Sequence, residues 1–459
     1  MGITLAGPRA RRLPPPGLPG RKNRYALLTI FMAASPLVDL TAVGDVAGGG
    51  VPAEAPEVRP APSRTRMIVV LGLLVALGPL TIDMYLPALP RIASELGLSS
   101  SVAQLTLTGT LGGLALGQLI VGPLSDALGR RRPLVAGILL HMAASVLCLF
   151  APNIEVLGVA RTLQGVGAAA ASVVAIAVVS DLFEESVAAV VMSRLIMVLG
   201  VAPVLAPSLG AAVLLHGSWH WVFAALAVLG GAILAVAVLA LPETLAVADR
   251  RPLKLRAILR TYVEVLSDIR FVVLVIVGAL GMSGLFAYIA GAAFVLQGRY
   301  GLDQQTFALV FAAGAIALIG ATQFNVVLLR RFEPQKIALV ALVAASAFGL
   351  GFVVLAALHV GGLAGFLIPV WAMLAAMGLV IPNTPAVALA RHPDAAGTAA
   401  AALGAAQFGL GAAVAPLVGA LGNGEVALAA VMTTGVVVAL FALLSVGDTG
   451  ASGHERHRS

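Results

Sequence analysis

Residues 122–133 read GPLSDALGRRRP, a short polar stretch that separates two long apolar runs at 103–122 and 133–151. Glycine, proline, serine and aspartate are residues that favour a turn. The three arginines that follow, Arg130 to Arg132, are of the kind that collects in cytoplasmic loops. The stretch therefore predicts a tight cytoplasmic loop between two membrane helices, an arrangement that suggests a transport protein.

The composition of the chain places it in a lipid bilayer. Of its 459 residues, 60% are hydrophobic and only 11% are charged, whereas a soluble domain carries about 25% charged residues. The apolar runs do not alternate as half-buried strands do, and each is about 20 residues long, enough for a helix to cross a hydrocarbon core of about 30 Å. We therefore expect an all-α integral membrane protein.

Twelve apolar segments follow one another from residue 67 onwards. They lie at 67–89, 103–122, 133–151, 154–178, 188–215, 219–241, 271–297, 305–328, 337–358, 361–385, 396–420 and 425–446. When the connections are assigned alternately to two sides, eighteen arginines and lysines fall on one side and two, Arg91 and Arg299, on the other. Positive residues stay inside, so we expect twelve transmembrane helices with both termini in the cytoplasm. The acidic loop 179–187 departs from this pattern.

The segments divide into two sets of six around the longest internal connection. We expect a Pro/Arg-rich disordered cytoplasmic tail at 1–66, a first six-helix half at 67–241, a cytoplasmic central loop at 242–270, a second half at 271–446 and a cytoplasmic tail at 447–459. The tail includes a short apolar stretch at 25–38, which is open to interpretation as a signal-like segment or as a consequence of a start codon set too far upstream. Two six-helix halves are typical of secondary transporters.

Several other classes of function are excluded. The net charge of +7 does not form a basic stripe with interleaved aromatic residues, which argues against nucleic acid as a partner. None of the three lysines follows a glycine, so the chain has no Walker A loop and no ATPase of its own. The histidines do not cluster, and no nucleophile–base pair is evident, so we expect no metal, no cofactor and no enzymatic activity. A pump of this kind must use an ion gradient or a partner protein.

Several stretches resemble the major facilitator superfamily, and within it the Bcr/CflA-type drug/proton antiporters of the bicyclomycin resistance group. They read PLTIDMYLPALP at 79–90, GPLSDALGRRRP at 122–133, LGVARTLQGVGAAAASVV at 157–174 and APVLAPSLGAA at 202–212, and RHPDAAGTAAALGAAQFGLGAAVAPLVG at 391–419 is also similar. The resemblance covers about residues 70–445. It departs from the general antiporter pattern at Ala206, at Ala211 and at Ala127.

This resemblance implies a twelve-helix major facilitator fold in two pseudo-symmetric halves. It also implies a monomer in the inner (cytoplasmic) membrane that exports small amphipathic drugs in exchange for protons. An exporter of an endogenous metabolite, such as an amino acid, a small peptide or a self-made antibiotic, is the alternative. A membrane receptor or scaffold that moves no substrate is the third reading, which the six-plus-six layout and the intramembrane aspartate disfavour.

Asp83 and Arg161 are the candidate proton-coupling residues. An ionisable side chain inside a membrane helix is costly and therefore functional by default. Counted along their helices, the two residues fall at similar depth in the outer half of the bilayer, and the resemblance makes a contact between them plausible. We expect Asp83 to exchange the proton and Arg161 to modulate its affinity; the alternative is an ion pair that only fixes helix packing.

The candidate gating residues fall in two groups. In the loop signature, Asp126 is predicted to meet the N-terminus of the helix 396–420 near Thr398, where the helix dipole favours an anion. Helix 5 carries prolines that permit a kink and a glycine that permits close approach, as a hinge or as simple packing. The full set is Gly122, Asp126, Gly129, Arg130, Pro203, Pro207 and Gly210.

The candidate substrate cavity is mainly apolar with a few hydrogen-bonding groups, which suits moderately lipophilic drugs. Its predicted polar members are Tyr85, Gln164, Tyr288, Asn383 and Gln407.

Overall fold

The computed structural model describes residues 63–447, and these residues fold into helices joined by short connections. Twelve helices in this part are long and apolar enough to cross a membrane. The predicted all-α fold with twelve spanning helices is confirmed, with boundaries that differ from the predicted ones by a few residues. The predicted tails lie outside the described residues, except for 63–66 and Gly447.

The first half contains the first six spanning helices. Its elements are α2 (Arg64–Asp83), η2 (Leu86–Ala88), α3 (Leu89–Glu95), α4 (Ser100–Leu128), α5 (Arg131–Leu149), α6 (Ile154–Leu182), α7 (Glu185–Leu214) and α8 (His220–Ala240). Polar residues fix several helix starts. The Ser99 hydroxyl accepts the N–H of Val102 at 3.4 Å, and the Asn153 side chain accepts that of Val156 at 3.0 Å. Such caps satisfy backbone donors that a helix start leaves free.

The second half repeats this plan. Its elements are α10 (Ile269–Ala293), the π-helical η4 (Phe294–Arg299), α11 (Gln304–Leu328), α12 (Pro334–Leu358), α13 (Gly362–Leu389), η5 (Pro393–Ala395), α14 (Ala396–Ala420) and α15 (Glu425–Gly447). The first helix of each half changes geometry near its end: α2 gives way to η2, and α10 gives way to a π-helical turn. Irregular segments at matching positions of two repeats are typical of transporter binding sites.

The central connection contains structure that the predicted loop 242–270 did not include. It holds η3 (Val247–Asp249) and the helix α9 (Leu255–Leu266). Leu255, Leu259 and Val263 form an exposed apolar stripe on α9, while Tyr262 faces the protein and donates a hydrogen bond to the Leu119 carbonyl at 3.4 Å. The four-residue spacing of this stripe is the pattern of an amphipathic helix, a signal that the sequence-based prediction of a loop did not use.

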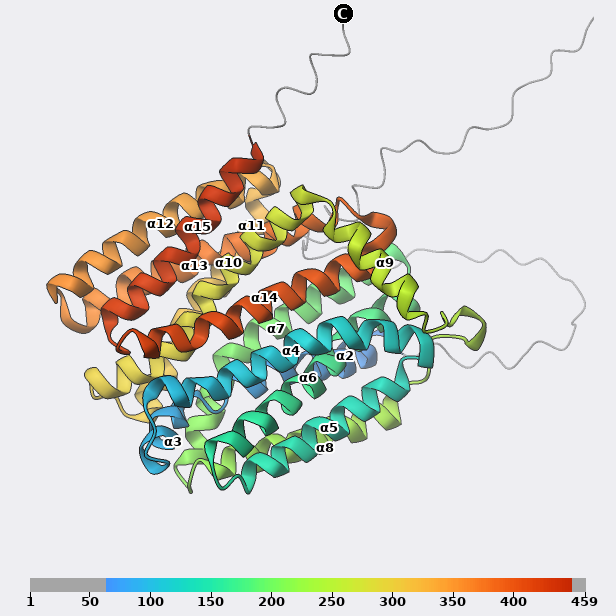
Figure 1. The fold of residues 1–459 in the computed structure, drawn as a ribbon. Helices are drawn as coiled ribbons and strands as arrows, with labels where there is room; N and C mark the ends of the chain where they lie inside the picture. Colours follow the sequence, from blue (N-terminus) through green and yellow to red (C-terminus); the bar gives the residue numbers. More distant parts are fainter. Residues whose placement is uncertain (1–62, 448–459) are drawn as a thin grey trace, which may run out of the picture.

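The two halves meet along two pairs of helices, α4 with α14 and α7 with α11. Figure 1 shows α14 running beside α4, with the helices of the second half on the other side of α14. Within the first half, α4 and α6 approach closely at Gly165, which has no side chain. A Cβ at this position would overlap the carbonyl oxygen of Thr110. Small residues allow such contacts between membrane helices.

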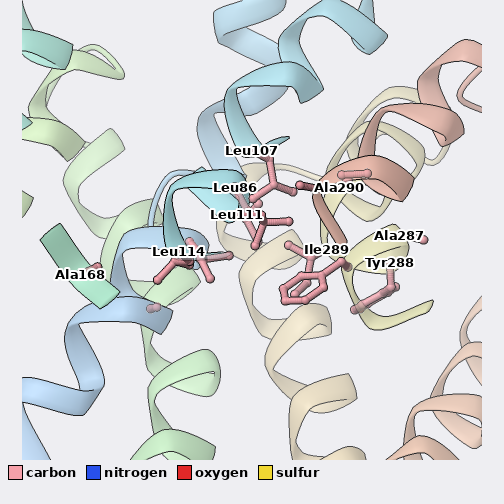
Figure 2. Close-up of a cluster of buried hydrophobic side chains, with 14 of the residues drawn as sticks. Leu86, Leu107, Leu111, Leu114, Ala168, Ala287, Tyr288, Ile289 and Ala290 are labelled. Atoms are coloured by element: carbon pink, nitrogen blue, oxygen red, sulfur yellow. The ribbon is translucent and has the colours of Figure 1, made fainter. Parts of the chain in front are cut away.

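Bonds between the halves concentrate at the end of the bundle opposite the charged loops. The Gln104 side chain donates to the Ala290 carbonyl and to Asn423, each at 3.1 Å, and accepts the N–H of Gly419 at 3.0 Å. Gln297 donates to the Pro87 carbonyl at 3.2 Å. Figure 2 shows the apolar cluster that packs here, with leucines of η2 and α4 beside residues of α10; its labelled members are Leu86, Leu107, Leu111, Leu114, Ala168, Ala287, Tyr288, Ile289 and Ala290. The two halves are therefore bonded and packed against each other on the side that we predict to be extracellular.

Candidate transport site

The site is built around the interruption of α2. Pro87 has no N–H to bond the carbonyl of Asp83, and its ring excludes a continued helix, so α2 ends at Asp83. Carbonyl groups in the last turn of a helix lack partners within the helix. The Thr81 carbonyl oxygen is one of them, and both terminal nitrogens of Arg161 donate to it at 3.1 Å.

Arg161 is fully buried and is held by groups other than Asp83. It donates to Gln164 Oε1 at 2.6 Å, and its guanidinium lies 4.1 Å from the ring centre of Tyr85 and 5.7 Å from that of Phe223. The expected contact between Arg161 and Asp83 is absent from the ion pairs of the described residues, so this expectation is wrong for this conformation. The physical reason is that the negative end of the interrupted helix offers the cation a partner of its own.

A chain of hydrogen bonds continues from Arg161 into α5. Gln164 donates to the Ser145 hydroxyl at 2.7 Å, and His141 Nε2 lies 2.9 Å from the Thr81 hydroxyl. That hydroxyl donates its single hydrogen to the Leu77 carbonyl at 2.6 Å, so His141 must be the donor in its bond to Thr81. Neutral His141 therefore carries its proton on Nε2, and its Nδ1 has no partner among the described residues.

Sequence reasoning missed this part of the site. It did not assign a role to His141 or to Ser145, although the two stand four residues apart on one face of an apolar segment. It placed Tyr85 and Gln164 in a substrate cavity. In this structure the two belong to the buried network, where Tyr85 shares a hydrogen bond of 3.2 Å with Thr106, and their role in substrate binding stays a prediction.

Asp83 stands apart from this network. Its side chain is only 2% exposed, and its Oδ1 has no hydrogen-bond partner within the described part of the chain. It is also the last residue of α2, the end at which the helix dipole disfavours an anion. Within the described residues, this carboxyl group has no counter-ion within 4.0 Å and its Oδ1 has no donor that would stabilise its charge.

Helix α7 packs against the same interruption. It stays helical through Pro203 and Pro207. One turn further on, a Cβ at Gly210 would overlap the Met84 carbonyl oxygen, next to Asp83 in the chain. The predicted close approach at Gly210 is thus made to the break in α2.

The polar candidates of the second half lie in separate contacts. Asn383 donates to Asn325 at 2.7 Å and to the Leu379 carbonyl at 2.7 Å, so it ties α13 to α11. Tyr288 stacks on Phe311 with ring centres 5.2 Å apart, and its hydroxyl has no partner among the described residues. Gln407 is half-buried on α14.

At the charged end of the bundle, the loop signature forms an ion cluster. Arg130 donates to Asp126 at 2.5 Å, to Ser125 at 2.9 Å and to Asp181 at 2.8 Å. Thr244 also donates to Asp181 at 2.8 Å. Asp181 belongs to the acidic segment 179–187, which departs from the predicted charge pattern. The cluster explains this departure, because the Asp181 carboxylate binds the Arg130 cation.

Glu243 completes this cluster from the connection after α8. Its carboxylate accepts the N–H groups of Arg130 at 2.8 Å and of Arg131 at 3.2 Å, and so caps the start of α5. Burial alone would raise the pKa of Glu243, but these N–H groups, that of Leu245 and the charge of Arg250 hold the pKa below its usual value. Gly129, with φ of 88°, lies so close that a Cβ there would come within 2.5 Å of the carboxylate.

The remaining gating candidates are less constrained. A Cβ at Gly122 would meet no atom within 4 Å. The carboxylate of Asp126 is 43% exposed and is bound to Arg130. No contact with Thr398 is found among the interactions of the described residues, so the proposed latch to α14 stays a prediction for another conformation.

These features define a class of protein. Twelve spanning helices in two repeated halves, an interrupted helix in the first half and a buried carboxyl group at the interruption are the design of a membrane transporter. The sequence profile of the Major Facilitator Superfamily matches residues 71–416, and the chain belongs to this superfamily. It is therefore a multi-pass transport protein and not an enzyme.

Known proteins give the same assignment. The chain is 35% identical over 389 residues to an uncharacterized MFS-type transporter, YdgK, of Bacillus subtilis, covering 83% of this chain and 96% of the relative. It is 28% identical over 360 residues to a bicyclomycin resistance protein homolog of Haemophilus influenzae, covering 77% and 89%. The resemblance drawn from the sequence motifs is thereby confirmed.

A solved structure shows the same fold. The xylose transporter XylE from E. coli, in a partially occluded inward-open conformation, superimposes with a TM-score of 0.65 at 13% identity, covering 83% of this chain and 97% of that one.

Proposed function

We propose that the chain is a drug/proton antiporter that exports small amphipathic compounds by alternating access, with the proton gradient as its energy source and no cofactor. The observation that carries the proposal is Asp83: a carboxyl group buried at the end of an interrupted helix, whose Oδ1 has no hydrogen-bond partner and which forms no ion pair with any described residue. We place the protein in the cytoplasmic membrane as a monomer with both termini inside.

The chemistry of the proposal follows from the cost of a buried charge. An unpaired aspartate inside the bilayer costs about 2.5–3.5 kcal/mol or more. Arg161 does not offset this cost in this conformation, because its terminal nitrogens donate to Thr81 and Gln164 and it forms no ion pair with Asp83 among the described residues. A proton offsets it when the site is closed, and water or a bound drug offsets it when the site opens. Proton and drug would then compete for Asp83, which is the requirement for antiport.

The class of substrate is inferred from the relatives and from the lining of the bundle. The relative from Haemophilus influenzae is named for resistance to bicyclomycin. The buried side chains between the halves are mainly apolar, as in the cluster of Figure 2. This composition suits amphipathic drugs better than sugars, which need many polar partners.

Transport in reconstituted vesicles tests the proposal. In proteoliposomes loaded with a pH-sensitive dye, we expect each drug of a resistance panel to release protons with the wild-type protein and none with Asp83→Asn. Asp303→Asn, which changes an exposed carboxylate outside the spans, is the matched control and should transport normally. Normal drug/proton exchange by Asp83→Asn would overturn the coupling role, and absence of any flux with the wild type would overturn the antiporter assignment.

A further inference from the structure

A groove on the flank of the second half has no role in the proposed cycle. Helices α11 and α12 both pack on α13 but make few contacts with each other. The space between them has a volume of about 520 Å³, which lies in the range of ligand sites. Its floor is formed by small side chains, namely Ala321, Ala341, Ala344, Ala372, Ala375 and Ala376.

The groove has the length of one leaflet of the bilayer. Its lining residues on α12 run from Lys336 to Phe348, twelve residues apart, which corresponds to about 18 Å along a helix. Half of a hydrocarbon core is about 15 Å. The residues that flank the groove point outward, since Val340 is 68% and Phe348 is 45% exposed. The groove therefore opens toward the hydrocarbon, and its length matches that of a single acyl chain.

One end of the groove is basic. Lys336 is the charged residue of its lining, and Arg330 and Arg331 lie in the adjoining connection between α11 and α12. All three are exposed and take part in no ion pair within 4.0 Å in the described part of the chain. Glu333 is the acidic residue of this connection, so the mouth keeps an excess of positive charge.

We propose that this groove binds an anionic phospholipid, with one acyl chain along the alanine floor and the phosphate on Lys336, assisted by Arg330 and Arg331. Basic pockets between helix ends favour anionic headgroups, and a long lysine side chain reaches to the headgroup level while its stem stays in the apolar region. A drug is a poorer fit for this groove, because Lys336 supplies the polar contact and the remaining lining is apolar.

Native mass spectrometry of the full chain, titrated with phosphatidylglycerol or phosphatidylcholine, tests both parts of the proposal. We expect the wild type to prefer phosphatidylglycerol and Lys336→Gln to lose about fivefold in that preference, the factor that corresponds to about 1 kcal/mol per basic residue. Lys254→Gln makes the same change in charge away from the groove and should keep the preference. Ala344→Phe fills the groove and should weaken the binding of both lipids.

The control for the filled groove is Ala347→Phe, an exposed position on the same helix outside the lining. If Ala344→Phe does not stay folded, Ala375→Leu fills the floor with a smaller side chain. Equal losses in Lys336→Gln and Lys254→Gln would overturn the headgroup contact. Equal binding by the filled and control variants would overturn the acyl-chain site, as would a stable dimer that Ala344→Phe dissociates, because a second copy would then occupy the groove.

Discussion

In the first half, the helix α6 brings Arg161 and Gln164 into the bundle, whereas α13, its counterpart in the second half, brings in Asn383. Arg161 lies at the centre of a network that reaches His141 through Thr81, and a buried carboxyl group lies close by in the chain. Asn383 exchanges two hydrogen bonds with Asn325, at 2.7 and 3.5 Å, and donates one to the Leu379 carbonyl of its own helix. The repeated fold thus holds charged chemistry in one half and only neutral hydrogen bonds at the matching place in the other.

This difference shows that the two halves of a repeated fold take different roles. A buried charge must be held in place by several partners, because leaving it unsatisfied is costly in a membrane. The first half supplies these partners, and it also carries the ion cluster of Arg130. At the matching place, the second half supplies packing surfaces and neutral hydrogen bonds. We therefore expect substitutions of polar groups to cost more in the first half than in the second.

The largest loss of stability is expected from Arg130→Gln. The Arg130 side chain is 9% and its partner Asp181 14% exposed, so the substitution leaves a mostly buried carboxylate without its cation. Breaking such a pair costs about 3 kcal/mol. Thermal unfolding in detergent measures the loss, and Arg132→Gln, an exposed neighbour, is the control. Equal unfolding temperatures for the two variants would show that the cluster does not stabilise the first half.

Gly210→Ala is expected to have the next largest effect. The added methyl group would overlap the Met84 carbonyl oxygen, and overpacking of this kind costs about 1–3 kcal/mol. At Gly200, on the same helix, a Cβ would stand 3.4 Å from Ile319, an ordinary contact, so Gly200→Ala should be tolerated. Unfolding temperature and growth on a drug panel are the measurements. If both variants behave like the wild type, α7 does not support the break in α2.

A smaller effect is expected in the second half from Asn383→Leu. The substitution leaves Asn325 without its partner, but hydrogen bonds between membrane helices average only about 0.6 kcal/mol. The double variant with Asn325→Leu removes the unpaired group and should regain part of the loss, as a double-mutant cycle will show. A loss as large as that of Arg130→Gln would contradict the difference between the halves.

The smallest effect on stability is expected from Glu243→Gln, and this effect depends on pH. Its pKa is held below the ordinary value of 4.5, so the unfolded chain takes up the proton first as the pH falls. The stabilisation by this carboxylate is therefore fully present above about pH 4.5 and is lost as the pH falls through the lower folded-state value. We expect the wild type to unfold at a higher temperature than Glu243→Gln at pH 7, and the difference to shrink below pH 4.5. A difference that grows on acidification would reverse the assigned sign.

The fold was predictable because the length of each apolar run and the unequal distribution of arginine and lysine between the two sides are properties of whole segments. Twelve apolar runs of helix length predict twelve spans regardless of how they pack. The break at Asp83 was not predicted, because the apolar run 67–89 continues through it. Pro87 disfavours a continued helix, but it does not identify the group that takes up the freed carbonyl of Thr81. That group is Arg161, and the choice between Thr81 and Asp83 as its partner depends on side-chain geometry across two helices.

The same limit applies to partners that are far apart in the sequence. Asn325 and Asn383 are separated by 58 residues, and Arg130 and Glu243 by 113. Each residue alone is ambiguous, and only the packing of the helices decides which polar groups meet. The bonds of Tyr85 to Thr106 and of Gln164 to Ser145 could not be predicted for this reason.

The most direct measurement of the central claim is proton release on drug binding. Purified protein in weakly buffered detergent solution is mixed with a drug that it transports, and the change in pH is recorded for the wild type, Asp83→Asn and Asn383→Leu. Because Asp83 is a buried carboxyl group with no counter-ion in the part of the chain that the structure describes, we predict proton release by the wild type and by Asn383→Leu and none by Asp83→Asn. Undiminished release by Asp83→Asn would contradict the account.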